Sequence, residues 1–332
     1  MRLLLVGDPH VTVEELGDAQ GLLDGVHALY GQLGPDKVIF MGDLHHNHAV
    51  TRVEVTDFWL RNLARFPKDK LVLILGNHDR PNDASSTAHA LQAYHSLAAV
   101  VSGVQSLGEG VFVAPYFHSR GDLVESMQQF NKSVKVLLCH QTFDGSRYEN
   151  GFFAPDGLDP RLLGIQRVIS GHIHTSQALN WEEGYVQYIG SPRWRSISDA
   201  NVNKSVVLYD TETDIFQGFD TQNWCSPIGK ATLSNVKELD TVSFVRNPKA
   251  RLHLDVVGAK VEVEVQTALI KAQVPRAKIR PVYTDQSNKR LSVTESEGVF
   301  NALRRYVAAF RPTYGTPASV LQDMVVRRLN AG

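Results

Sequence analysis

Short runs of apolar residues recur along the first two thirds of the chain, separated by polar or mixed segments. Eight of these runs are typical of β-strands covered on both faces: residues 3–7, 37–42, 71–76, 111–116, 134–140, 167–172, 186–191 and 205–210. Between the first three runs, apolar residues return every three or four positions, from Leu16 to Leu33 and again from Val55 to Leu63. This alternation of strands and helices predicts an α/β domain.

The pattern loosens after Cys225, where proline, glycine and asparagine interrupt it as far as Pro248. We therefore place a domain boundary near residue 225. Beyond it, residues 251–258 alternate like a strand and residues 261–273 favour a helix. Residues 277–284 predict an edge strand, because Pro281 cannot donate a backbone hydrogen bond.

Two more helices are predicted near the end of the chain. The first begins with a capping box formed by Thr294 and Glu297, and the second has Pro317 in its first turn and an apolar face that runs to Leu329.

Composition limits the possible partners. The formal net charge is -1, so the chain has no general attraction for nucleic acid or for an anionic membrane, although residues 251–332 hold 13 Lys or Arg against 7 Asp or Glu. Two cysteines do not make a disulfide framework, and no run approaches the ~20 apolar residues of a membrane span. Since residues 3–7 are too few for a signal peptide, we expect a cytoplasmic protein with no membrane partner.

Side chains suited to metal binding follow five of the apolar runs. Any one of them could be an ordinary turn or cap residue, but together they predict a metal site, because the carboxyl ends of strands converge in α/β sheets. They are Asp8 and His10, then Asp43, then Asn77 and His78, then His140, and finally His172 and His174.

These blocks, D-x-H, G-D, G-N-H-D, a single H and G-H-x-H, resemble the calcineurin-like metallophosphoesterases over residues 2–220. The resemblance implies a β-sandwich flanked by helices, two divalent metal ions, and a water molecule activated between them. Mn²⁺ is the expected ion, and Mg²⁺, Fe²⁺, Co²⁺ and Zn²⁺ suit similar ligands. It also implies the ligands: Asp8, His10, Asp43 and His174 for one ion, and Asp43, Asn77, His140 and His172 for the other.

His78 is left outside this ligand set. In the family, the corresponding histidine faces the departing oxygen, so the resemblance implies that His78 protonates the leaving group or stabilises its charge.

Three features are similar to DNA nucleases of the SbcD type. His46 follows Asp43 as in their G-D-L-F-H motif, although His45 replaces the aromatic residue. The segments 188–192 and 203–213 are similar to those that follow G-H-x-H. The strand-helix-strand pattern looks like their smaller α+β capping domain, which implies a nuclease domain over 1–225, a DNA-capping domain over 226–290 and C-terminal helices over 291–332.

The same resemblance implies partners. They are DNA, a coiled-coil ATPase of the SbcC type and a second copy of the chain, in a bacterial cell or a phage-infected host. The helix from Pro317 to Leu329 is the expected ATPase contact, or else it packs on its own domain.

Arg193, Trp194 and Arg195 are candidate DNA contacts, since guanidinium groups bind phosphates and an indole stacks on bases; the alternative is a turn with a packed tryptophan. We interpret His48 as structural. The enzyme alternative is a small-molecule or cyclic-nucleotide phosphodiesterase or phosphatase. The non-enzyme alternative is a binding scaffold, which the complete ligand set and His78 disfavour.

Overall fold

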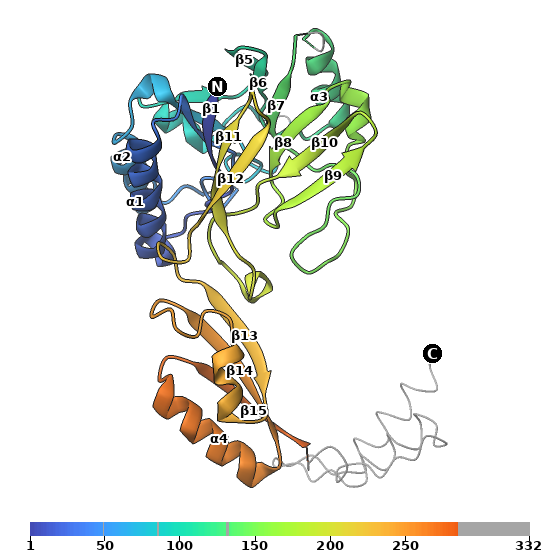
Figure 1. Cartoon of the computed structure of the whole chain (residues 1–332). Helices are drawn as coiled ribbons and strands as arrows, with labels where there is room; N and C mark the ends of the chain where they lie inside the picture. The colour runs from blue at the N-terminus through green and yellow to red at the C-terminus, as the bar shows by residue number, and fades with distance from the viewer. Residues whose placement is uncertain (49, 85, 131–132, 285–332) are drawn as a thin grey trace, which may run out of the picture. The chain divides into compact units, whose positions relative to one another are not determined.

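The computed structural model describes residues 1–48, 50–84, 86–130 and 133–284 (Figure 1). The chain divides into two compact units. The first contains residues 1–230 and 243–251, and the second contains residues 231–242 and those from 252 onward. The two helices predicted near the end of the chain, within residues 291–332, lie outside the described residues.

The first unit contains two six-stranded mixed sheets. One has the order β12-β11-β1-β2-β3-β4, and its strands are β1 (Arg2–Val6), β2 (Lys37–Phe40), β3 (Leu71–Ile74), β4 (Ala99–Val101), β11 (Ser205–Asp210) and β12 (Ile215–Asp220). The other has the order β5-β6-β7-β8-β10-β9, and its strands are β5 (Gln105–Gly108), β6 (Val111–Val113), β7 (Val136–His140), β8 (Arg167–Gly171), β9 (Gln177–Trp181) and β10 (Gly184–Tyr188). In each sheet the central strands are parallel and the antiparallel pairs lie toward the edges.

A single apolar cluster joins the two sheets. Leu5 and Ile39 come from the first sheet, and Leu138 and Ile169 come from the second, and all four side chains are fully buried. The outer face of the first sheet packs on helices α1 (Leu16–Leu33) and α2 (Val53–Leu63). Helix α3 (Arg120–Gln128) belongs to the apolar cluster on the outer face of the second sheet. This is the helix-flanked β-sandwich that the family resemblance implies.

Short 3-10 helices connect several of these elements: η1 (Val13–Glu15), η2 (Lys68–Lys70), η3 (Ala90–Tyr94), η4 (Pro160–Leu163), η5 (Ile197–Asp199) and η6 (Val236–Thr241).

A three-stranded sheet with the order β13-β14-β15 and one helix follow the sandwich in the chain. Its elements are β13 (Ile228–Leu233), β14 (Arg251–Gly258), α4 (Lys260–Gln273) and β15 (Lys278–Tyr283). Val263 and Ile270 of α4 are buried, and β15 lies at the edge of the sheet, as Pro281 predicts.

All eight apolar runs form strands, and the two predicted amphipathic segments form α1 and α2. In the described part of the chain, no helix combines the length and the hydropathy that a membrane crossing needs.

Candidate metal centre

The predicted ligands gather where strands of both sheets end. Asp8 and His10 follow β1, Asp43 follows β2, and Asn77 follows β3, while His140 is the last residue of β7. His172 and His174 follow β8. Because β1, β2 and β3 are parallel neighbours in one sheet, and β7 and β8 in the other, their carboxyl ends bring these residues to one place.

Asp8, His10 and His174 form a first ligand group, in which the candidate ligand atoms all lie within 4.8 Å of one another. His10 Nε2 lies 2.9 Å from His174 Nε2, and His174 Nε2 lies 3.8 Å from Asp8 Oδ2. Asp8 and His10 are each only 1% exposed. A buried carboxylate and two imidazoles are a donor set suited to a transition-metal cation.

Asp43, His140 and His172 form a second ligand group with the same 4.8 Å limit. Asn77 belongs with them, because its Oδ1 lies 3.0 Å from His140 Nε2 and 2.9 Å from His172 Nδ1. An amide oxygen adds a neutral ligand, which limits the negative charge of the group.

Asp43 lies between the two groups. Its Oδ2 is 3.3 Å from His10 Nε2 and also 3.3 Å from His140 Nε2. Its Oδ1 accepts a hydrogen bond of 2.8 Å from the backbone N–H of His78. A carboxylate in this position can contact two cations at once.

Two histidines are oriented by hydrogen bonds from the ring nitrogen that faces away from the centre, Nδ1. His140 Nδ1 donates to the backbone oxygen of Met41 at 2.8 Å, and His174 Nδ1 donates to Glu149 Oε1 at 2.6 Å. Each bond fixes the hydrogen on Nδ1 and leaves the Nε2 lone pair facing the centre, as in metal-ligating histidines.

An unpaired polar atom at the centre also fits a cation. Asp8 Oδ1 is buried and has no hydrogen-bond partner among the described residues. Leaving such an atom unpaired away from water is costly. The residues present therefore suit two divalent cations.

Burial and mutual charge shift the protonation of these groups. Burial raises the pKa of Asp8 to about 6 and lowers the pKa of His172 to about 3. For His140, burial favours a lower pKa, but the charges of Asp43 and Asp8 outweigh it and raise the pKa to about 9. Burial would raise the pKa of Asp43, yet His140 and His10 hold it well below its usual range. Without a cation, a proton on His140 thus balances the carboxylates.

The backbone at the centre is strained. The backbone φ values of three non-glycine residues lie in the left-handed region, which such residues rarely adopt: 44° for His10, 52° for Asp43 and 78° for His172. Gly42 permits the close packing here, since a Cβ on it would lie 2.2 Å from His140 Nδ1.

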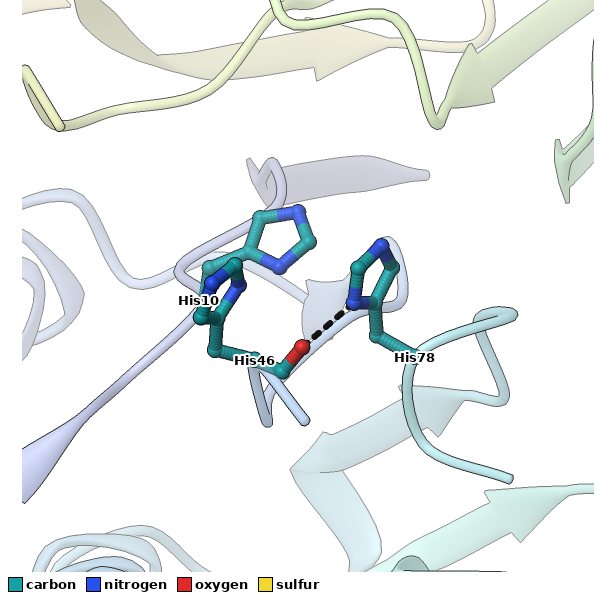
Figure 2. Close-up of side chains that lie close together, drawn as sticks. All are labelled: His10, His46 and His78. Atoms are coloured by element: carbon teal, nitrogen blue, oxygen red, sulfur yellow. Dashed lines mark hydrogen bonds between the residues drawn. The ribbon is translucent and has the colours of Figure 1, made fainter. Parts of the chain in front are cut away.

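Histidines outside the two ligand groups line the centre as well (Figure 2). His78 Nδ1 donates to the backbone oxygen of His46 at 2.5 Å, and the two rings stack with centroids 5.6 Å apart. Nitrogens of His10, His46 and His78 lie within 4.8 Å of one another. Burial lowers the pKa of His78, and burial followed by the charge of Arg195 lowers the pKa of His46 to about 4.

His48 also belongs to this region, although the sequence favoured a structural role for it. Its Nδ1 donates to the backbone oxygen of Asn77 at 2.9 Å, and its ring centroid lies 3.9 Å from that of His78. Asp79 supports the same loop, because its Oδ1 accepts from the backbone of His45 and its Oδ2 accepts from the backbone of Gly76.

Arg193 and Trp194 do not contact solvent, so the prediction that they bind DNA is wrong. Both are fully buried. Arg193 Nη2 donates to the backbone oxygen of Pro9 at 2.7 Å, and its Nη1 pairs with Asp18 at 3.1 Å. Trp194 Nε1 donates to the backbone oxygen of Val202 at 2.7 Å. The guanidinium group supports the loop after β1, and the indole is the packed tryptophan of the alternative interpretation.

Arg195 differs from its two neighbours, because it is only partly buried. Its backbone N–H donates to Asp199 Oδ2 at 2.9 Å, and its charge lowers the pKa values of both His46 and His10, after the larger effect of burial. Its Nε is buried and has no hydrogen-bond partner in the described part of the chain. The structure thus leaves Arg195 as a positive group beside the histidines.

A family model matches the part of the chain that contains all the predicted ligands. The family model described as calcineurin-like phosphoesterase matches residues 1–176. Two solved structures are similar over 66% of this chain. One is a novel archaeal phosphodiesterase, with 12% sequence identity, 99% of its own chain covered and a TM-score of 0.36. The other is Yfce, a phosphoesterase from E. coli, with 16% sequence identity, 98% of its own chain covered and a TM-score of 0.35. No curated protein sequence matches significantly.

Proposed function

Because the chain belongs to the calcineurin-like phosphoesterase family, we propose that it is a metal-dependent phosphodiesterase that cleaves DNA strands. The observation that carries the proposal is the place of Asp43, whose Oδ2 lies 3.3 Å from an imidazole nitrogen of each ligand group. A shared carboxylate between two sets of metal ligands is the arrangement that a dinuclear phosphoesterase needs.

In this proposal each cation has four ligands. Asp8, His10, Asp43 and His174 would hold one ion, and Asp43, Asn77, His140 and His172 would hold the other. When bound, two such ions neutralise the charge of a phosphate group and lower the pKa of a water molecule to near neutrality. Mn²⁺ is the proposed ion.

His78 has the proposed role of assisting the leaving group. Since a carbonyl oxygen only accepts hydrogen bonds, the bond to His46 fixes the hydrogen on His78 Nδ1 and leaves Nε2 for the substrate. Only the protonated form of His78 carries a hydrogen on Nε2 for the departing oxygen. Burial lowers the pKa of His78, which makes this form a stronger acid and also a smaller fraction of the protein near neutral pH.

Two side chains support a nucleic-acid substrate. His46 stands where SbcD-type nucleases have a histidine that assists the DNA phosphate, and its nitrogen lies close to those of His78 and His10. Arg195 adds a positive charge beside His46. A guanidinium group next to the ligand groups suits the phosphate of a strand that extends past the reacting centre.

The proposal includes partners of the SbcC–SbcD kind: a coiled-coil ATPase and a second copy of this chain. Deleting residues 317–332 should leave the sandwich folded and abolish binding of a co-expressed ATPase. Unchanged complex formation would reject the assignment of that segment, and sedimentation of the purified chain tests the homodimer.

The decisive experiment is a Mn²⁺-dependent assay on end-labelled duplex and single-stranded DNA, with bis-p-nitrophenyl phosphate in parallel. Asp43→Asn should abolish both activities, and His95→Ala, which changes an exposed histidine, should leave both intact. Cleavage of DNA by the wild type supports the proposal. Turnover of the small ester alone would favour the small-molecule phosphodiesterase instead, and no turnover of either substrate would contradict both.

A further inference from the structure

Glu149 contacts a metal ligand from a part of the chain that the family motifs do not include. It lies in the long connection between β7 and β8, and its Oε1 is 2.6 Å from His174 Nδ1. Both side chains are largely covered, with 18% of Glu149 and 24% of His174 exposed. A bond this short between a carboxylate and an imidazole N–H is charge-assisted and stronger than a neutral one.

The connection that carries Glu149 is fastened on both sides of it. The backbone N–H of Arg147 donates to Gln177 Oε1 at 2.9 Å, and Gln177 Nε2 donates back to the oxygen of Arg147 at 2.7 Å. The N–H of Tyr148 donates to the oxygen of Phe152 at 2.9 Å. Since Gln177 is the first residue of β9, the sheet itself sets the position of Glu149.

We propose that Glu149 is a positioning residue for the cation held by Asp8, His10 and His174. Its carboxylate keeps the hydrogen of His174 on Nδ1, turns Nε2 toward the cation and makes that nitrogen a better electron donor. The proposal rests on the two-cation site described under the proposed function.

In the second ligand group, the carboxylate oxygen beside His140 Nδ1 is Asp8 Oδ1, and at 3.7 Å it is too far away for a hydrogen bond. His140 donates its Nδ1 hydrogen to the neutral backbone oxygen of Met41 instead. Glu149 therefore distinguishes the two cation sites, and its loss should weaken only one of them.

The test is calorimetric titration of the metal-free protein with Mn²⁺. The wild type should show two binding steps, and Glu149→Gln, which keeps the size of the side chain, should weaken one step by roughly 10- to 100-fold and leave the other unchanged. Glu149→Asp should recover part of the loss. Glu183→Gln, an exposed change in the turn between β9 and β10, is the matched control and should match the wild type.

Three results would overturn the proposal, and they differ from one another. Two unchanged steps in Glu149→Gln and Glu149→Ala would remove Glu149 while leaving the proposed function intact. Equal losses at both steps, with a lower unfolding temperature of the metal-free variant, would show a purely structural role. A wild type without two Mn²⁺ steps would contradict this proposal and the two-cation site together.

Discussion

Replacing His78 with alanine separates leaving-group chemistry from metal binding. The side chain of His78 is outside both ligand groups, and the bond that supports Asp43 comes from the His78 backbone N–H, at 2.8 Å. Alanine keeps that N–H, so Asp43 should stay in place. We expect His78→Ala to bind Mn²⁺ with the affinity of the wild type.

The expected cost is in turnover. A lost general acid typically lowers the rate by ~10²- to 10⁴-fold, which equals about 2.7 to 5.4 kcal/mol of activation free energy. The bond from Nδ1 to His46 holds the ring in one orientation, so little of this assistance is lost to ring rotation. The loss of turnover in His78→Ala should therefore be at least ~10²-fold.

The assay compares two leaving groups under the same conditions. A p-nitrophenolate departs without a proton, whereas the sugar oxygen of DNA needs one, so the loss should be much larger on DNA than on bis-p-nitrophenyl phosphate. His95→Ala is the control. Equal losses on both substrates would refute proton donation by His78, and unchanged turnover on DNA would remove the residue from the chemistry altogether.

Two further predictions concern the residues that hold the centre. Asp199→Asn leaves Lys204, whose Nζ is 2.6 Å from Asp199 Oδ1, buried without its countercharge, and should lower the free energy of unfolding by about 3 to 5 kcal/mol in urea at pH 7. Burial opposes the ionised form of Asp199, but the charge of Lys204 outweighs this effect and lowers the pKa of the carboxyl group. The pair therefore stabilises the folded protein above the unfolded-state pKa of Asp199, which is about 4. The difference in unfolding free energy between wild type and Asp199→Asn should shrink as the pH falls below that value, and a constant difference would contradict the assignment. Gly42→Ala places a Cβ 2.2 Å from His140 Nδ1 at a φ of +110° and should weaken one Mn²⁺ step by about tenfold or more in calorimetric titration, whereas an unchanged step would show that His140 can move without loss.

The parts of the site that the sequence predicts are those with a local signal. Asp8, Asp43 and Asn77 stand directly after buried apolar strands, and parallel strands carry their ends to one edge of a sheet. The pattern of apolar runs alone therefore predicts that these ligands lie close together. The strands it misses include β4, which has only three residues, and β5, in which none of the four residues is buried.

Residues that act through tertiary contacts leave no such signal. Glu149 reaches His174 because Gln177 fastens its loop, and nothing in the spacing of the two residues indicates it. The cluster of Arg193 and Trp194 misleads for the converse reason, since a basic-aromatic composition does not say which way the side chains face. In the folded chain, backbone oxygens and Asp18 satisfy the arginine internally.

The most direct test of the dinuclear site is anomalous diffraction from crystals grown with Mn²⁺. The account predicts two adjacent peaks that share Asp43, one beside Asp8, His10 and His174 and the other beside Asn77, His140 and His172. A single peak, or peaks that Asp43 does not contact, would contradict it.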